Sequence, residues 1–335
     1  MKNLNYFITK KKIPSNTRLR YLITIPCVNR EERNAINVID KTFEIFDNSG
    51  LFNSNIDISI LLFESGSNNT NYLKCIDTYK IKYPSTMINI IYSNKSLNGI
   101  SNTFKMFFYI KKLPLHLFDF IIWMDDDIYV CKNFIKNADA WIKNYANYSL
   151  FSSLYVPYNT FLIKDKKDVQ MANLPGFYGT CCTIFKPRLA NFVIPFWYDS
   201  HFEEFNYNPD TRFRDSVRKY FPSVKRICVS FPSLVEHMNI GSAIKEKKDV
   251  KIGHKAKFFI GIDNDPKFYN DDNIFGISEQ KSNNKLNDES NDKTKDDKTK
   301  DKSKDDKTKD DKTKDESKDD KTKENDIKIW TNYMH

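Results

Sequence analysis

Short apolar runs alternate with stretches of helical periodicity between residues 20 and 124. The apolar runs, rich in β-branched residues, span residues 20–28, 57–63, 87–92 and 119–124. The helical stretches span residues 30–46, 71–83 and 103–112. Runs of this kind are typical of buried strands, and strands that alternate with helices favour βαβ crossovers. We therefore predict an α/β fold with a doubly wound sheet.

The pattern changes after about residue 150. Residues 155–157, 176–185 and 226–237 are typical of strands and loops, arranged around one helix at 211–220. We expect one domain over residues 20–262, with halves at 20–135 and 150–262, after an N-terminal extension of residues 1–19.

Beyond residue 262 the apolar residues thin out. The pentapeptide DDKTK begins at Asp296, Asp305, Asp310 and Asp319. Such a tract buries too little apolar surface to offset the entropy of ordering, so we predict a disordered charged tail over 263–326. A short terminal segment, 327–335, follows it.

The net charge of +9 lies outside this tail, because Lys and acidic residues balance between residues 281 and 325. Although the folded part is basic, no recognised nucleic-acid motif accompanies the charge, and we predict no nucleic-acid partner.

No apolar run reaches the length of a transmembrane helix, and the N-terminus lacks the apolar core of a secretory signal. The six scattered cysteines indicate reduced thiols. We expect a cytoplasmic protein, located in host cytoplasm or the virion if its source is a virus.

Three consecutive carboxylates, Asp125, Asp126 and Asp127, directly follow the fourth predicted strand. Like charges this close repel one another unless a cation neutralises them. Ligands of open α/β sheets bind beyond the carboxyl ends of strands, so a divalent ion held with a diphosphate suits this position. The alternative is a surface turn, or a helix cap with solvated acids. The chain lacks the Walker A pattern and the GxGxxG pattern, which disfavours an NTPase or a dinucleotide enzyme.

Four blocks in order resemble the N-acetylglucosaminyltransferase IV family (glycosyltransferase family 54) of GT-A glycosyltransferases. They are ITIPCVNRE at 23–31, IIWMDDDIYVCKNF at 121–134, GFYGTCCTIF at 176–185 and FPSLVEHMNIGSAI at 231–244. The family usually has Glu where Asp125 stands, and we find no counterpart of its Golgi anchor, stem or C-terminal lectin-like domain. The resemblance implies a GT-A (Rossmann-like) fold with a mixed, mostly parallel sheet flanked by helices. It also implies transfer of GlcNAc from UDP-GlcNAc to a glycan or glycoprotein acceptor.

The resemblance implies a metal site and a donor site. The metal, Mn²⁺ or Mg²⁺, would be bound by Asp127, Asp125 and His237. The alternatives for His237 are a donor to the diphosphate and a structural role. The nucleotide-sugar donor would contact Pro26, Arg30, Glu31, Glu64, Asn98, Asp125, Asp126, Gly179 and Ser242. Asp125 would bond to ribose or to metal-bound water, and Ser242 to phosphate. For Arg30 and Glu31 the alternative is a place at a helix N-terminus, and for Gly179 a tight turn.

An inverting transferase also needs a carboxylate that deprotonates the acceptor hydroxyl. Asp210 matches the position of the family's base in chain order, with Asp215 as second candidate and Glu203 or Glu204 behind it. The alternative for Asp210 is a helix N-cap, since Asp is a preferred capping residue. The aromatic residues at 197, 198, 202 and 207 are either an acceptor platform or part of the core.

Three other functions stay open at this point. The same fold and metal could serve another nucleotide sugar, such as one of glucose or rhamnose. The chain could instead be a non-catalytic scaffold that binds nucleotide or glycan. Nucleic-acid binding is the third, and it predicts a steep salt dependence that we do not expect.

Overall fold

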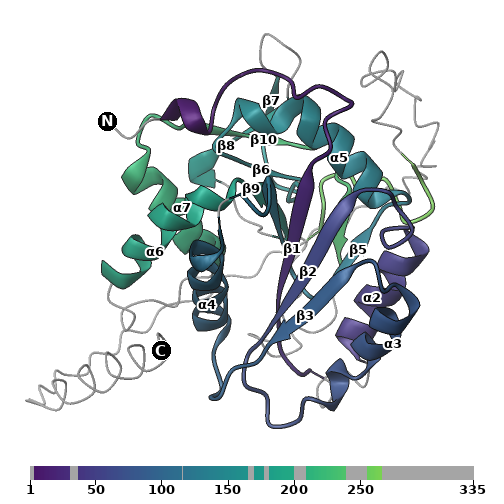
Figure 1. Cartoon of the computed structure of the whole chain (residues 1–335). Coiled ribbons are helices and arrows are strands. Elements are labelled where there is room, and N and C mark those ends of the chain that lie inside the picture. The colour runs from purple at the N-terminus through teal and green to yellow at the C-terminus, as the bar shows by residue number, and fades with distance from the viewer. Residues whose placement is uncertain are drawn as a thin grey trace, which may run out of the picture. The chain divides into compact units, whose positions relative to one another are not determined.

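One nine-stranded sheet organises the described part of the chain (Figure 1). The computed structural model describes residues 4–30, 37–114, 116–164, 170–176, 181–199, 209–238 and 255–265. In sheet order the strands are β3 (Met87–Ile91), β2 (Asp57–Glu64), β1 (Arg20–Cys27), β4 (Phe120–Met124), β9 (Cys182–Phe185), β6 (Phe151–Ser153), β10 (Arg226–Val229), β8 (Gln170–Asn173) and β7 (Leu162–Lys164). A separate pair joins β11 (Val235–His237) to β5 (Ile128–Val130). The described residues all belong to the first of two compact units, Met1–Ser278, and the second is Glu279–His335.

The helices connect these strands and cover both faces of the sheet. The α-helices are α2 (Val38–Asn48), α3 (Cys75–Lys82), α4 (Gly99–Lys112), α5 (Phe134–Tyr145), α6 (Ala190–Asp199) and α7 (Pro209–Tyr220). Short 3₁₀ turns are η1 (Leu4–Tyr6), η2 (Asn71–Leu73), η3 (Ala146–Tyr148), η4 (Leu174–Gly176) and η5 (Pro187–Leu189). Figure 1 shows α4, α6 and α7 on one side of the sheet, and α2 and α3 on the other.

Strand direction makes the sheet mixed but mostly parallel. The pairs β3–β2, β2–β1 and β1–β4 are parallel. β9 runs antiparallel to both of its neighbours, β4 and β6, and β8 runs antiparallel to β10 and β7. Among the described residues, β8 and β9 therefore run opposite to the other strands of this sheet. Because β1, β2 and β4 run in the same direction, their carboxyl ends lie at one edge of the sheet.

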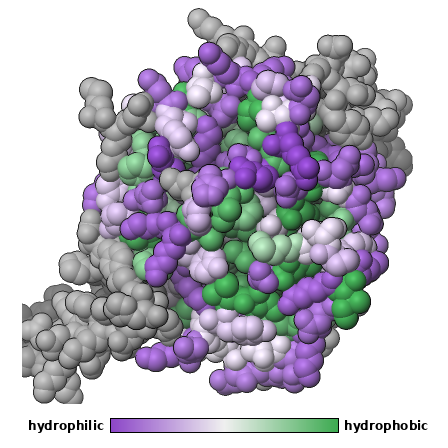
Figure 2. Space-filling view, in the orientation of Figure 1, coloured by the Kyte–Doolittle hydropathy of each residue, from purple (hydrophilic) through white to green (hydrophobic). Residues whose placement is uncertain are grey.

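The two faces of the sheet bury different side chains because residues alternate along each strand. Tyr21, Ile23 and Ile25 of β1 join one apolar cluster with side chains of α2, α3 and α5. The other face is aromatic: Trp123 of β4 lies edge-on to Phe107 of α4, with ring centroids 5.4 Å apart. On the face seen in Figure 2, apolar surface gathers over the region of β2 and β3, mixed with hydrophilic side chains.

Two segments without long elements complete the fold. The N-terminal segment lies against α5, since Ile13 donates its N–H to Lys143 and Lys10 to Asn147. Residues 255–265 form bridges to Pro157 and Ser233. Of the helices in the described residues, none is both long and apolar enough to cross a membrane.

The predicted α/β class and the mixed, mostly parallel sheet flanked by helices are confirmed. The four N-terminal strands appear where they were predicted. The prediction of one helix in the second half was wrong, because α6 precedes α7. The helix α5 was not predicted either. The predicted tail, apart from residues 263–265, lies outside the described residues.

Candidate metal and donor site

The candidate site lies where β1, β2 and β4 end at one edge of the sheet. Cys27 is paired with Glu64 at the last positions of β1 and β2. Asp125 directly follows β4, and its N–H donates to the carbonyl of Cys181 at 3.2 Å. Open α/β sheets bind ligands at this edge, where loops diverge beyond the strands.

Asp125, Asp127 and His237 form a cluster, which we call the metal trio. Each offers one ligand atom, and these three atoms lie within 4.8 Å of one another. The antiparallel pairing of β11 with β5 explains how His237 arrives there, because His237 pairs with Ile128, the residue after Asp127. The His237 Nε2 atom lies 3.3 Å from Oδ1 of Asp127. Two carboxylates and an imidazole are a donor set that suits Mn²⁺, so these residues fit the expected metal.

Arg30 supplies the positive charge of this site. Its Nη1 donates to Oδ2 of Asp127 at 2.9 Å, and its Nη2 makes a very close ion pair with Asp126. All three side chains are buried. The guanidinium therefore neutralises two carboxylates that burial would otherwise leave uncompensated.

Asp126 joins the site to neighbouring elements. Its carboxylate accepts from the N–H of Val28 at 3.4 Å as well as from Arg30. Its carbonyl oxygen accepts from the hydroxyl of Thr42, on α2, at 2.6 Å. These contacts hold Asp126 in place, and they thereby position the backbone that joins Asp125 to Asp127.

The surroundings of Asp125 raise the pKa of its carboxyl group. Burial raises its pKa to about 6, and the negative charges of Asp127 and Asp210 add to the rise. His237 and Arg30 act in the opposite direction. A divalent cation bound at the trio would favour the charged form of this carboxyl.

Glu64 organises the loop after β2. Its carboxylate accepts from the N–H groups of Gly66 and Ser67, at 2.7 and 2.9 Å, and from the hydroxyl of Tyr72 at 3.3 Å. Gly66 has a φ of +80°, and a Cβ there would lie 1.9 Å from the carbonyl oxygen of Lys95. The observed contacts of Glu64 are thus with the chain itself, and they order the loop that follows β2.

The remaining predicted donor residues take different places. Pro26 lies in β1, paired with Phe63. Asn98 is the N-cap of α4, and its side chain accepts from the N–H of Ser101 at 2.8 Å. Glu31, Gly179 and Ser242 lie outside the described residues, and so do the alternative bases Glu203 and Glu204.

The two candidate bases differ in their surroundings. Asp210, in the first turn of α7, lies close enough to Asp125 for its charge to raise that residue's pKa. Its Oδ1 also accepts from the N–H of Thr211 at 3.1 Å. Asp215 is bound instead by Arg214 and Arg218, at 3.1 and 3.4 Å. The structure thus brings Asp210 within electrostatic reach of Asp125, while Asp215 pairs with two arginines of its own helix.

Sequence reasoning missed two polar residues that hold the site together. Thr42 supports Asp126, and Asn102 of α4 donates to the carbonyls of Phe63 and Cys27 at 2.6 and 3.4 Å. Both are buried on apolar helix faces. A single polar residue within an otherwise apolar helix face was the sequence signal that could have identified each of them.

Trp197, one of the predicted platform residues, is fully buried and stacks on Phe104, so it belongs to the core.

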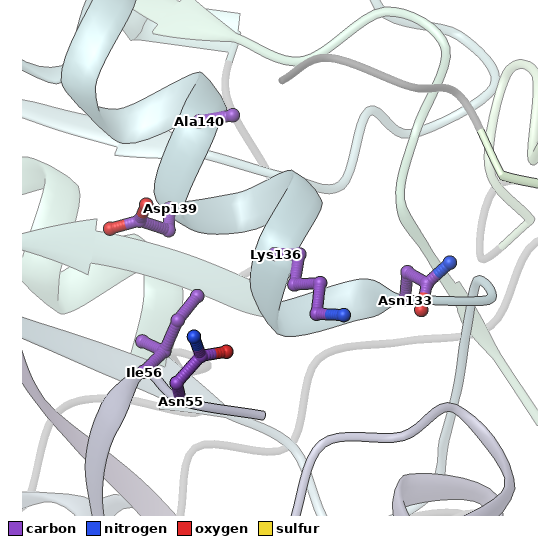
Figure 3. A pocket seen from close by; sticks show the side chains of 6 residues that line it. All are labelled: Asn55, Ile56, Asn133, Lys136, Asp139 and Ala140. Carbon is purple, nitrogen blue, oxygen red and sulfur yellow. The ribbon is translucent and has the colours of Figure 1, made fainter. Parts of the chain in front are cut away.

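A cavity of about 450 Å³ lies away from the trio (Figure 3). It is lined by Asn55, Ile56, Asn133, Lys136, Asp139 and Ala140. Asn55 and Ile56 precede β2, so this cavity lies at the strand's amino end. Asp139 accepts from the hydroxyl of Tyr21 at 2.7 Å and pairs with Lys143 at 2.8 Å. The candidate site is therefore not this cavity.

No protein-family model matches the chain, and no curated protein matches it. Among solved structures, a mannosyltransferase from Pyrobaculum calidifontis, in complex with GDP-Man and Mn²⁺, matches 66% of this chain at 9% identity with a TM-score of 0.42. GalNAc-T7 with UDP, GalNAc and Mn²⁺ matches 65% at 13% identity with a TM-score of 0.44. A 4-diphosphocytidyl-2C-methyl-D-erythritol synthase from Anaerococcus prevotii matches 64% at 15% identity with a TM-score of 0.38. The chain spans 59%, 43% and 89% of these proteins, respectively. These scores are low, and the site's own residues support the function proposed below.

Proposed function

We propose that this chain is a metal-dependent inverting glycosyltransferase of the GT-A type. It transfers a sugar, with UDP-GlcNAc as the first donor to test, to a hydroxyl of a glycan or glycoprotein. The observation that carries the proposal is the metal trio at the carboxyl edge of β4. Asp125 and Asp127 come from one loop and His237 from a strand distant in sequence, and their ligand atoms converge within 4.8 Å.

The chemistry follows from the charges at this edge. Mn²⁺ or Mg²⁺ held by Asp125, Asp127 and His237 would stabilise the negative charge that develops on the departing nucleoside diphosphate. The guanidinium of Arg30 adds a fixed positive charge beside Asp127. The loop that Glu64 orders, and the loop that Asn29 joins to it through the hydroxyl of Ser67 at 3.1 Å, would hold the nucleotide.

Asp210 is the proposed base. Its carboxylate would take the proton of the acceptor hydroxyl as the new bond forms between that oxygen and the anomeric carbon. The bond from the anomeric carbon to the diphosphate breaks at the same time, and its electron pair leaves with the nucleotide. One-step displacement of this kind inverts the anomeric centre. The position of Asp210 in electrostatic reach of Asp125 supports this role.

The test is a panel of UDP-sugars and GDP-sugars, assayed for hydrolysis and transfer with Mn²⁺ and with EDTA. We expect turnover of one donor with Mn²⁺ and none with EDTA. Asp127→Asn should abolish both Mn²⁺ binding and turnover. Asp210→Asn should lower kcat at least about 100-fold and leave Mn²⁺ binding intact, as expected of a base. Donor binding without turnover in every condition would indicate a scaffold and refute the proposal.

A further inference from the structure

Four aromatic side chains are exposed on loops of the second half of the chain. They are Tyr158, Phe161, Phe231 and Phe258, with exposed fractions of 53%, 73%, 36% and 54%. We call these four residues the aromatic surface. Among the described residues, the other exposed aromatic side chains are Tyr6 and Tyr92. Since aromatic residues dominate the core of this chain, four left exposed in one group need an explanation.

Hydrogen bonds tie the loops that carry these rings into one surface. The N–H of Tyr158 donates to Lys255 at 2.8 Å, and the N–H of Ser233 donates to Phe258 at 2.8 Å. The rings of Phe231 and Phe258 have centroids 6.0 Å apart. The Nζ of Lys257 donates to the carbonyl of Thr160 at 2.9 Å, between Tyr158 and Phe161.

This surface is continuous with the candidate site. Phe231 lies six residues before His237, so the two are at most about 20 Å apart along the chain. Glu236 reinforces the connection, because its Oε1 accepts both the N–H of His237 and the N–H of Ala256, each at 2.9 Å. The segment that carries Phe258 is thereby bonded to the strand that carries His237. A chain of a few sugar units would reach from the aromatic surface to the metal trio.

The chemistry of the surface selects its occupant. The exposed large apolar side chains at 158, 161, 231 and 258 are all aromatic, and Lys255 and Lys257 between them are exposed. Flat rings with an electron-rich face bind the C–H faces of sugars, and ammonium groups donate to sugar hydroxyls. Ile262, 50% exposed, is the one exposed large aliphatic side chain on the described residues of these loops, so the aromatic rings outnumber it four to one. A protein partner would be served equally well by aliphatic side chains.

We infer that the aromatic surface binds the glycan chain of the acceptor and holds it outside the catalytic edge. This inference rests on the proposed function, because only a glycosyltransferase needs to hold an acceptor glycan. Glycan binding at the surface itself requires neither the metal nor the donor. The two can therefore fail separately.

The test measures retention of the full chain on beads that carry oligomannose or GlcNAc-terminated N-glycans, in EDTA and without donor. Replacing a ring with Leu keeps an apolar side chain and removes the flat face. We expect Phe161→Leu and Phe258→Leu each to weaken binding about twofold to tenfold, and the double variant more. Phe161→Tyr should bind as the native chain does, and Tyr6→Leu serves as the control for loss of an exposed ring elsewhere.

Asp127→Asn should keep glycan binding even though it is expected to lose transfer. Glycan retention by a chain that shows no transfer with any donor would support the surface and refute the proposed function. Any of three results would overturn the inference. The first is that the native chain is not retained on either glycan, and the second is that the Leu variants bind glycan as well as the native chain does. The third is that the Leu variants lose binding to a 20-nucleotide poly(U) RNA while they keep binding to glycans.

Discussion

Replacement of Arg30 is the sharpest perturbation of the candidate site. Arg30, Asp126 and Asp127 are 6%, 6% and 3% exposed, and Arg30→Met leaves both carboxylates buried without their counter-charge. Breaking a buried ion pair on one side typically destabilises a protein by about 3–5 kcal/mol. For a domain of this size, that corresponds to a melting temperature lower by roughly 10 °C. Thermal unfolding in EDTA measures the loss.

Mn²⁺ should restore much of this stability, because the cation takes over the neutralisation of Asp127. Saturation at 100 times Kd is worth about 2.7 kcal/mol, and we expect a larger gain in Arg30→Met than in the native chain, where the guanidinium already occupies that carboxylate. Arg20→Met is the matched control: its partner Asp119 is only half-buried, so the loss should stay below about 1 kcal/mol. The reasoning fails if Arg30→Met melts like the native chain in EDTA, or if Mn²⁺ stabilises neither protein.

Three further predictions concern the supports of the site. Thr42→Val removes the hydrogen bond to the carbonyl of Asp126, and we expect a loss of about 1–3 kcal/mol in urea unfolding, whereas Thr42→Ser should retain the bond and most of the stability. Gly66→Ala combines a positive φ with a clash against the backbone of Lys95. It should therefore lower the free energy of unfolding by more than Gly50→Ala, where φ is +74° but the atom nearest to the added Cβ is 4.0 Å away. Equal losses of stability in the two variants would contradict the clash. Burial lowers the pKa of Lys105 to about 8, below its value in the unfolded chain. Between pH 8 and about 10.4 the unfolded state therefore binds more protons, and stability relative to Lys105→Met should rise with pH; a flat difference would refute this.

The sequence predicted the N-terminal half of the fold because local signals and tertiary structure agree there. The predicted strands appear as β1 to β4. Those at 20–28, 57–63 and 119–124 are mostly buried, whereas the strand at 87–92 is the half-exposed edge strand β3. The second half was harder to predict. Its strands β6, β9 and β10 have only three or four residues each, and α6 contains Pro195. Short strands and a proline within a helix remove the periodicity on which such predictions depend.

The residues of the candidate site also fall into two groups, those that the sequence predicted and those that it did not. The carboxylates after β4 and the histidine of the fourth block were predicted as metal ligands from the sequence and its family resemblance, and the structure places their ligand atoms together. The partners of these groups were not predictable. That Arg30 pairs with Asp126 and Asp127, and that Thr42 bonds to Asp126, depends on which loops meet beyond the strand ends. Such contacts join residues about 100 positions apart, and no local pattern encodes them.

The three side chains of the trio differ in burial and in their contacts. The side chain of Asp127 is 5% exposed, and Arg30 closes one side of it. The side chain of His237 is 22% exposed, and Asp125 is also partly accessible. Asp127 is bonded to Arg30 through Oδ2, while its Oδ1 faces His237. One carboxylate could then serve two charges: Oδ2 is held by the arginine, and Oδ1 would be the oxygen available to a bound cation.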